Sequence, residues 1–299
     1  MKSIDPKSVP TGQMFAYLLA AVAPRPIAFA STVDREGNVN LSPFSFFNCF
    51  GANPPTLVFS SSRRVRDATT KHTLENVKAV PEVVINVVNY PIVEQMSLSS
   101  TEYGQGVNEF VKAGLTEVAS VKVRPPRVGE SPVAFECEVR QVIETGTGGG
   151  AGNLIICEVV MVHIKEEFLD ENGKLDTPKL DLVARMGGSW YCRASGHALF
   201  EIPKPIGTKG IGIDQLPRSV RDSRILTGNN LGRLGNLEAL PDAQSIEAWA
   251  SGPPIIAILN EKNKGRDYIK NELHILGKKY LEEGNVEYAI KTLMVFDNI

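Results

Sequence analysis

The sequence has few cysteines, little excess charge and no long apolar run, and each shortage argues against a class of protein. Its four cysteines, at positions 49, 137, 157 and 192, are widely spaced and form no Cys-x-x-Cys pair, which favours reduced thiols over a disulfide framework. A formal net charge of -2 over 299 residues gives no support for a nucleic-acid or anionic-membrane surface. The apolar stretch 15–23 is too short to cross a bilayer and is ended by Pro24. We therefore expect a soluble, cytoplasmic protein with no nucleic-acid or membrane partner.

Signatures of metal binding and covalent catalysis are missing as well. The histidines at positions 72, 163, 197 and 274 have no partner four residues away and no cysteine or carboxylate at ligand spacing, so we expect no metal site. The sequence contains no Gly-x-Ser-x-Gly motif. Cys49 lies in so apolar a run that we expect a buried, structural thiol. Covalent catalysis by a side chain is therefore not expected.

One glycine-rich segment, Gly146 to Ala151, fits the loose dinucleotide-binding pattern. That pattern binds a pyrophosphate only between a strand and a helix, and here the strand-forming run 154–160 follows it. We interpret the segment as a hairpin loop, which can still lie beside a ligand.

The first two hundred residues have the pattern of a β-rich domain with a few short helices. Turn residues at 34–38 and 170–173 predict tight hairpins, and short helices are expected at 67–78, 92–97 and 108–113, the last ended by Gly114. Runs rich in Val, Ile and Phe predict strands at 26–33, 40–50, 56–60, 83–88, 133–143 and 154–164. The pattern is typical of a mainly β fold with α-helices, a barrel or sandwich rather than a doubly wound parallel sheet.

The composition changes after about residue 203. Residues 206–255 are rich in Gly, Asn and Leu-Pro pairs, whereas 267–283 and 286–296 have the apolar spacing of two amphipathic helices joined at Gly284. We therefore predict two domains, residues 1–203 and 204–299. The helical pair has the outline of one tetratricopeptide unit, which cannot bury both its faces, so we expect it to pack on the barrel or across a dimer interface.

The most informative stretch lies between Ala23 and Thr73, where hydroxyls, amides and cations alternate with strand-forming residues. A flat, phosphorylated cofactor such as a flavin needs both kinds of contact. The predicted phosphate donors, at a strand end and the next helix start, are Ser60, Ser61, Ser62, Arg63 or Arg64, Lys71 and Thr73. For the arginines the alternative is a solvated loop, and His72 either lies by the phosphate or points to solvent.

The ring of such a cofactor suits a slot walled by backbone and aromatic side chains, with a few polar groups at its rim. That mixture is offered by Ser45, Phe46, Phe47 and Asn48. Strand alternation would put Phe44 and Phe46 on one face and Phe47 on the other, so at least one set belongs to the core. Arg25, between two prolines, has a fixed direction; it contacts flavin or substrate, or it forms an ion pair at the barrel mouth.

Several short motifs occur in a specific order and spacing. They are Pro24-Arg25-Pro26, Gly37-x-x-Asn40-x-x-Pro43-x-Ser45 with Phe46-Phe47-Asn48, Pro54-Pro55, Lys71-His72-Thr73-x-x-Asn76, Val84-Ile85-Asn86-Val87 and Glu109-Phe110-x-x-Ala113-Gly114-Leu115-Thr116. Over roughly residues 14–200 the chain thereby resembles the flavin reductase-like family of FMN-binding split barrels, which includes flavoredoxins and the flavin reductase components of two-component monooxygenases. The segment Arg185 to Tyr191 is similar to the family's Gly-Gly plus aromatic segment near the flavin, although Trp190 and Tyr191 fit core or dimer contacts equally well.

The resemblance implies a Greek-key antiparallel split β-barrel with a C-terminal α-helical extension. It implies an NAD(P)H-dependent, FMN-binding flavoprotein oxidoreductase, with FAD as the alternative flavin, that passes reducing equivalents to flavin, a partner monooxygenase or another redox protein. It also implies a homodimer with the flavin near the subunit interface. The expected cofactor-binding residues are Arg25, Ser45, Phe46, Phe47, Asn48, Ser60, Ser61, Ser62, Arg64, Lys71, His72 and Thr73. No catalytic side chain is assigned, because the cofactor carries the hydride transfer.

Two other functions stay open at this point. An FMN-binding electron carrier or sensor of the flavoredoxin type would share the site without efficient NAD(P)H oxidation. A binding module would use the barrel as a scaffold and the helical tail to recruit a partner.

Overall fold

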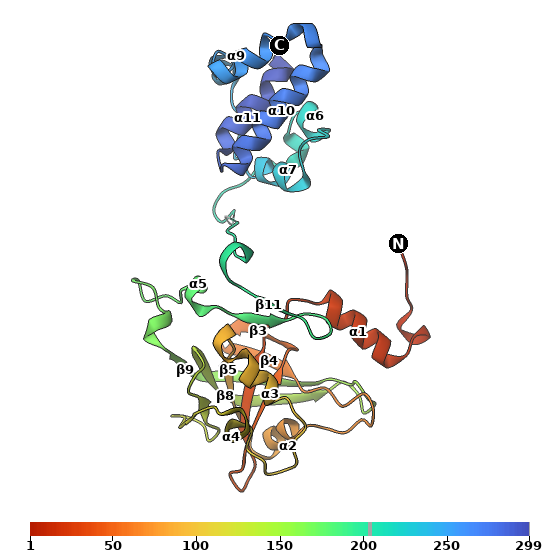
Figure 1. Cartoon of the computed structure of the whole chain (residues 1–299), viewed down its shortest axis with the longest axis vertical. Coiled ribbons are helices and arrows are strands. Elements are labelled where there is room, and N and C mark those ends of the chain that lie inside the picture. The colour runs from red at the N-terminus through yellow and green to blue at the C-terminus, as the bar shows by residue number, and fades with distance from the viewer. Residues whose placement is uncertain (203–204, 299) are drawn as a thin grey trace. The chain divides into compact units, whose positions relative to one another are not determined.

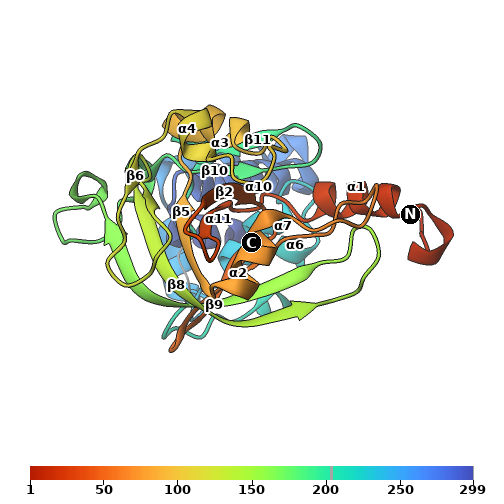
Figure 2. The same cartoon turned by 90° about the horizontal axis from the view of Figure 1, so that it is seen from below.

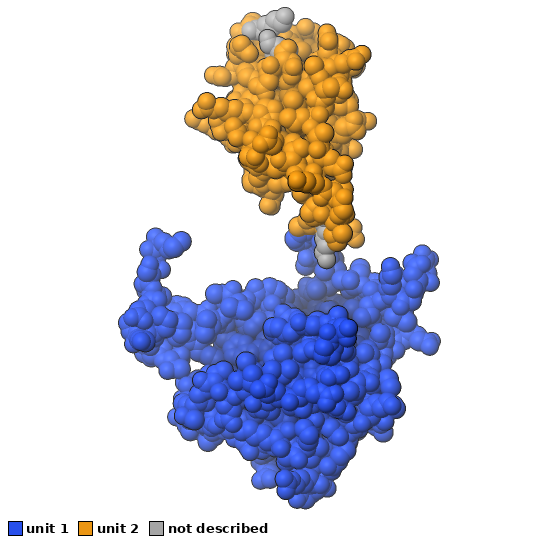
Figure 3. Space-filling view, turned by 180° about the vertical axis from the view of Figure 1, so that it is seen from behind, with its two compact units in different colours: residues 1–200 blue, residues 201–299 orange. Residues whose placement is uncertain are grey.

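The chain divides into two compact units, residues 1–200 and 201–299 (Figures 1 and 3). The computed structural model describes residues 1–202 and 205–298, and each unit has its own hydrophobic core. The domain boundary expected between residues 203 and 204 falls on the two residues that lie outside the described part, so it stays a prediction.

The first unit is built on a seven-stranded sheet in which neighbouring strands are antiparallel. The strand order is β2-β1-β5-β8-β9-β4-β3. Strands β2 and β3, which follow one another in the sequence, therefore lie at opposite ends of the sheet. Figure 2 shows the long β8 and β9 strands curving below α2 (His72–Ala79). The strands are β1 (Ala28–Val33), β2 (Val39–Phe44), β3 (Phe47–Ala52), β4 (Pro55–Ser60), β5 (Glu82–Val87), β8 (Val133–Glu144) and β9 (Asn153–Ile164).

Shorter elements complete the first unit. They are α1 (Thr11–Ala21), α3 (Val93–Leu98), α4 (Glu109–Ala113), α5 (Thr177–Leu180), the strand pair β6 (Glu117–Val118) and β7 (Arg127–Val128), and the strand pair β10 (Val183–Arg185) and β11 (Tyr191–Arg193). Gly114 ends α4 with a φ of 64°, in the left-handed region that favours glycine, as predicted. Among the helices that the structure describes, none is long and apolar enough to cross a membrane.

Strand β1 lies at the centre of the core, because all six of its residues are buried. Alternation places Ala28 and Ala30 in a cluster with Leu74 of α2. It places Phe29 in a second cluster with Phe110 of α4. The core therefore fixes α2 on one face of β1 and α4 on the other.

The strand predicted over 40–50 is in fact two strands. β2 ends at Phe44 and β3 begins at Phe47, with a bend at Ser45 and Phe46. The predicted alternation was wrong for this reason: Phe44 is buried, and Phe47 packs against the same cluster. The expectation of a buried Cys49 was also wrong; its side chain is exposed, because β3 is an edge strand whose middle residues face solvent.

The helix predicted over 67–78 begins only at His72. Ala68 has a φ of 57°, and the Arg64 amide donates to the Thr69 carbonyl at 2.9 Å. These residues therefore form a closed turn, which a right-handed helix cannot contain. Helices α3 and α4 lie within one residue of the predicted 92–97 and 108–113.

The predicted hairpins are confirmed. Gly37 has a φ of 91° in the β1–β2 turn, and Gly173 has a φ of 73° in the turn that the Asp170 amide closes by donating to the Lys174 carbonyl at 2.7 Å. β8 and β9 pair on either side of the glycine-rich segment, which is therefore a hairpin loop.

The second unit is helical. Its helices are α6 (Arg218–Arg221), α7 (Gly228–Gly235), α8 (Ala243–Ala250), α9 (Pro253–Leu259), α10 (Arg266–Glu282) and α11 (Val286–Val295). The predicted pair is confirmed as α10 and α11, with Gly284 between them at a φ of 84°. Gly277 allows the two helices to approach closely, since a Cβ there would lie 2.8 Å from the Leu293 side chain.

The α10–α11 pair buries its apolar faces within its own unit. Leu234 of α7 packs with Leu293 in one cluster, and Ile246 of α8 packs with Leu273 in another. The barrel or a second subunit is therefore not needed to cover these faces, and packing of the pair on the barrel or across a dimer interface stays a prediction. The cover within the unit was not expected because residues 206–255 were not recognised as helical, although Thr227 caps α7 through a capping box.

Candidate functional site

The predicted phosphate and ring segments lie side by side in the first unit. The Ser60 amide, at the end of β4, donates to the Phe46 carbonyl at 2.8 Å. The Lys71 ammonium lies 4.9 Å from the centre of the Phe44 ring. The loop from Ser61 to Lys71 therefore meets the bend between β2 and β3.

Lys71 is the least satisfied cation of this region. In the described residues its ammonium forms no ion pair or hydrogen bond, and its one recorded contact is the face of the Phe44 ring. Burial, and after it the neighbouring Arg64, lowers the pKa of Lys71. A cation that is partly desolvated and faces another cation is stabilised by an added anion. Lys71 is thus suited to contact a phosphate.

Arg64 is held along the same loop. Its Nε donates to Glu102 Oε1 at 2.9 Å, and its Nη1 donates to the Thr70 carbonyl at 2.6 Å and to Thr69 Oγ1 at 2.9 Å. Glu102 also accepts from Arg66 at 2.5 Å. Arg63 points elsewhere, toward Glu144 at 3.0 Å. Of the two arginines, Arg64 is therefore the one that faces Lys71.

The serines at the end of β4 differ in how well they are satisfied. Ser60 Oγ accepts from the Asn153 amide at 3.1 Å, and Ser62 is half-buried. Ser61 is 1% exposed, and its Oγ has no hydrogen-bond partner among the described residues. A buried hydroxyl without a partner is costly, so Ser61 is a candidate ligand donor.

The glycine-rich hairpin loop, residues 146–151, packs against the loop that carries Arg63 and Arg64. The Arg63 amide donates to the Ala151 carbonyl at 2.8 Å, and the Gly150 amide donates to the Arg63 carbonyl at 3.1 Å. A Cβ at Gly149 would lie 2.5 Å from the Val65 carbonyl oxygen. The absence of a side chain at Gly149 thus allows the two loops to pack together.

The start of α2 contributes backbone donors as well as side chains. Lys71 precedes the helix without a side-chain cap, so no side chain of the cap residue occupies the first amides of α2, which lie at the positive end of the helix dipole. Thr73 faces inward: it is fully buried, and its Oγ1 accepts from Asn40 Nδ2 at 3.0 Å. Thr73 therefore fastens α2 to β2, while His72 faces the neighbouring pocket.

The residues of the predicted ring slot have separate roles. Phe46 packs edge-on against Phe15 of α1, with 5.8 Å between ring centres. Phe47 is partly buried against the core, and Asn48 is exposed and accepts from the next backbone amide at 2.8 Å. Ser45 Oγ accepts from Arg25 Nε at 3.3 Å. The bend therefore combines aromatic surface with polar groups.

Arg25 is buried and bonds to backbone carbonyls. It is 5% exposed and donates to Leu19, to Val22 at 2.6 Å and to Met186 at 2.8 Å. These bonds connect the end of α1 to the loop before β11, so its most direct link to the predicted site is through Ser45. The alternative of an ion pair at the barrel mouth does not match these partners.

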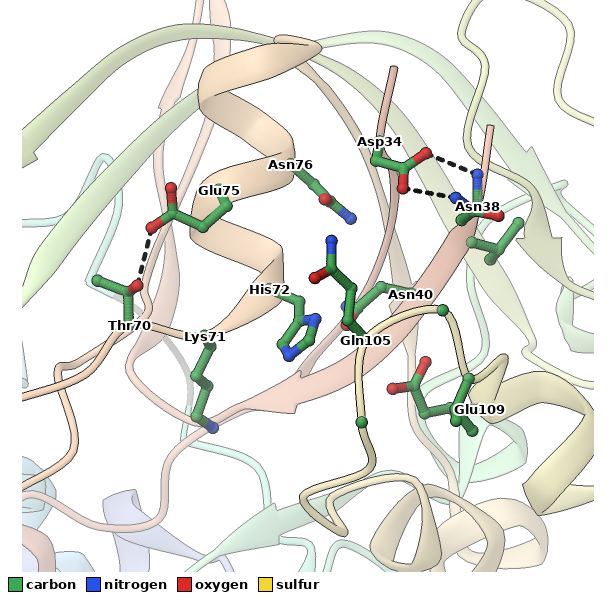
Figure 4. Close-up of a pocket in the computed structure, with 14 residues that line it drawn as sticks. Asp34, Asn38, Asn40, Thr70, Lys71, His72, Glu75, Asn76, Gln105 and Glu109 are labelled. Carbon is green, nitrogen blue, oxygen red and sulfur yellow. Dashed lines mark hydrogen bonds between the residues drawn. The ribbon is translucent and has the colours of Figure 1, made fainter. Parts of the chain in front are cut away.

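A polar pocket of about 260 Å³ opens beside Lys71 (Figure 4). Glu109 lies in its wall, where burial raises the pKa of its carboxyl group and Oε2 accepts from the Leu41 amide at 2.9 Å. The sequence prediction included only Lys71 and His72 from this pocket. The remaining lining residues are Asp34, Asn38, Val39, Asn40, Thr70, Glu75, Asn76, Gly104, Gln105, Gly106, Val107 and Glu109. His72, Glu75 and Asn76 are spaced to share one helix face, and this spacing could have predicted that Glu75 and Asn76 line the pocket together with His72.

The arrangement can hold a phosphate next to a flat ring. Cations, hydroxyls and helix amides lie at one end, and aromatic residues with polar neighbours lie at the other. Across residues 1–202 and 205–298, no group of three His, Cys, Asp or Glu side chains gathers at metal-binding distance.

A comparison with protein families decides the identity of the first unit. Residues 20–180 match the family model described as flavin reductase like domain. The chain belongs to this family. The resemblance found in the sequence motifs is thereby confirmed, and the matched segment ends before the second unit begins.

Relatives of similar sequence match a little under two thirds of the chain. An uncharacterized protein of Aquifex aeolicus is 35% identical over 189 residues, which cover 63% of this chain and 94% of the relative. An uncharacterized protein of Halalkalibacterium halodurans is 37% identical over 190 residues, covering 63% and 90%.

Solved structures agree on the fold. Nitrilotriacetate monooxygenase component B from Bacillus cereus is 27% identical with a TM-score of 0.63, over 68% of this chain and 98% of that one. Pseudomonas fluorescens 2-nitrobenzoate 2-nitroreductase is 26% identical with a TM-score of 0.60, over 70% and 100%. A Shewanella frigidimarina protein described as having a split barrel domain is 27% identical with a TM-score of 0.56, over 66% and 95%. The predicted split β-barrel followed by α-helices is confirmed.

Proposed function

We propose that this protein is an FMN-binding flavoprotein oxidoreductase, reduced by NADH or NADPH, that passes the reducing equivalents to free flavin or to a partner oxygenase. One observation carries the proposal. The Lys71 ammonium, which forms an ion pair with none of the described carboxylates, lies at the uncapped start of α2 beside the oriented Arg64. Family membership supports the flavin, and the donor set supports its phosphate.

The residues present fit FMN. Ser61, Ser62, Arg64, Lys71 and the first amides of α2 would hold the phosphate, with Ser61 Oγ gaining the partner that it lacks. Ser45 to Asn48 would border the ring. The remaining predicted residues are Arg25, Ser60, His72 and Thr73; of these, Arg25, Ser60 and Thr73 position the site through Ser45, Asn153 and Asn40.

The chemistry divides between cofactor and protein. Bound FMN would supply a centre that takes up a hydride and gives electrons to an acceptor. The protein's own residues would bind and orient the cofactor: the cations would neutralise its phosphate, and the aromatic bend would exclude water from one side of the ring. We assign no side chain as an acid or base.

Two further features concern partners. One of the similar structures is a component of a monooxygenase, which supports a partner oxygenase or another redox protein as electron acceptor.

Phe50, on the edge strand β3, is 69% exposed, and Trp190 is 78% exposed. Covering these side chains in a homodimer would remove apolar surface from water. Light scattering on the full-length protein measures the number of chains.

Spectroscopy tests the proposed activity. The purified protein, loaded with FMN, should show the visible absorption bands of bound flavin, and these should bleach when NADH or NADPH is added without oxygen. Bleaching only by a protein reductant would instead favour an electron carrier or sensor. Failure to bind FMN at all would overturn both functions.

A further inference from the structure

The helical unit contains a buried histidine that the proposed flavin chemistry does not use. His274 lies on α10 and is 1% exposed. Its Nδ1 lies 2.7 Å from Ser223 Oγ, and its Nε2 has no hydrogen-bond partner among the described residues. Whether a buried imidazole is tolerated depends on its charge, because burial penalises the protonated form.

The hydrogen bonds of Ser223 determine which form of the ring fits. Ser223 Oγ accepts from the Ile225 amide and from the Leu226 amide, each at 3.2 Å. A hydroxyl oxygen has two lone pairs and one hydrogen. Because both lone pairs are engaged, the hydrogen of Ser223 is donated to His274 Nδ1. A nitrogen that accepts carries no proton, so the ring that fits is neutral and has its hydrogen on Nε2.

A proton added to the ring would remove its bond to Ser223. The charged ring has N–H donors at both nitrogens. The donor at Nδ1 would then face an oxygen whose lone pairs are already engaged, and the donor at Nε2 would meet no acceptor among the described residues. Two buried donors without partners cost free energy, so the closed arrangement of Ser223 and His274 disfavours the charged ring.

The charges around the ring act in the same direction on balance. Burial, and after it Lys270 on α10, lowers the pKa of His274 from its ordinary value of 6.5 to about 4. Asp297, which follows α11, acts against this by attracting a positive charge, and it accepts a hydrogen bond from Ser219 Oγ of α6. The charged side chains of α6 and the turn after it are exposed; they are Arg218, Arg221, Asp222 and Arg224.

The bond between Ser223 and His274 fastens one segment of the second unit to α10. This α6 segment, residues 216–226, contains Val220, which is fully buried, and Leu226, which is 8% exposed. Both pack in the apolar cluster that includes Leu293 of α11. Loss of the bond would therefore loosen a segment that covers part of the helical core.

We propose that His274 and Ser223 form a proton-sensitive clasp, in which the neutral ring holds the α6 segment on α10 and protonation at mildly acidic pH releases it. The unfolded chain takes up this proton near pH 6.5, whereas the folded unit takes it up only near pH 4. The clasp therefore stabilises the unit fully above about pH 6.5, and this stabilisation is lost as the pH falls toward about 4. Release would expose Val220 and Leu226 to water.

Urea unfolding of the full-length protein tests the clasp. The sequence has two tryptophans, so a Trp190→Phe parent reports on the second unit alone through Trp249 of α8. Between about pH 7.5 and about pH 5, the unfolding constant of this parent should rise about 30-fold more than that of the same chain with His274→Asn, a difference of about 2 kcal/mol. Asparagine can still accept from Ser223 but takes up no proton. His197→Asn, at an exposed histidine in the first unit, is the matched control and should keep the pH dependence of the parent.

A second measurement needs no substitution in the clasp. Nitrogen NMR of protein labelled at histidine should show the His274 ring neutral, with its hydrogen on Nε2, down to about pH 5. Equal pH dependence in the parent and His274→Asn, or a His274 ring with a hydrogen on both nitrogens at about pH 6, would overturn the proposal. If His274→Asn does not fold, the NMR titration decides. Neither measurement contains FMN, so the result is independent of the proposed function.

Discussion

At the residue scale, Lys71 is the side chain whose loss should matter most for the phosphate. Lys71→Ala should weaken FMN binding by about 10- to 100-fold, since hydrogen bonds to charged groups contribute about 1.5–3 kcal/mol. Riboflavin, which lacks the phosphate, should lose little affinity. Titration of flavin fluorescence measures both ligands. Lys174→Ala, at an exposed lysine directly after the 170–173 turn, should change neither affinity. Equal losses for FMN and riboflavin would contradict the phosphate assignment.

Site residues that lie close together in the sequence were predictable, whereas the distant residues that contact them were not. Ser61, Arg64 and Lys71 lie on the single loop between the end of β4 and the start of α2. Recognising that strand end and helix start was enough to predict that these three residues lie near one another. Glu102 reaches Arg64 from 38 residues away, and Gln105 enters the pocket from the same distant loop. No local periodicity links that loop to α2, so the fold alone reveals the contact.

At the scale of elements, the glycine-rich hairpin loop is coupled to the phosphate loop by close packing. Gly149→Ala should destabilise the protein by about 1–3 kcal/mol through overpacking, because the new Cβ would meet the Val65 carbonyl at 2.5 Å. It should also weaken FMN binding, since Arg64 precedes Val65. Gly148→Ala, with open space around its Cβ, is the control. Urea unfolding and FMN titration measure the two effects, and identical behaviour of both variants would show that the hairpin loop does not support the site.

Elements were predictable where alternation or amphipathic spacing is strong. The strands of the β8–β9 hairpin and the α10–α11 pair were found close to their true bounds. The bend at Ser45 was missed because Ser45 is flanked by Phe44 and Phe46 in a run of strand-forming residues, with no Gly or Asp to mark a turn. Only the positions of β2 and β3 at opposite ends of the sheet reveal it. Helices α6 to α9 were missed because they are short and depend on tertiary packing rather than on propensity.

At the scale of the whole molecule, the family match and the site share one unit. Residues 20–180 carry the match, and every residue proposed for FMN lies within them. The second unit has its own apolar clusters around Leu234 and Ile246. The residues proposed to hold FMN and the apolar clusters of the helical unit therefore lie in separate units of the chain.

A shortened protein ending at residue 202 tests this independence. Because the core around β1 and the loop from Ser61 to Lys71 are both complete within the first unit, the shortened protein should fold and should bind FMN within about twofold of the full-length affinity, a change well below the factor of ten that corresponds to about 1.4 kcal/mol. Circular dichroism and flavin titration check fold and affinity separately. Loss of the β-sheet signal on truncation would show that the helical unit stabilises the barrel. An intact sheet with weakened FMN binding would instead show that the second unit contributes to the flavin site. Flavin binding would then be a property of both units rather than of residues 1–202 alone.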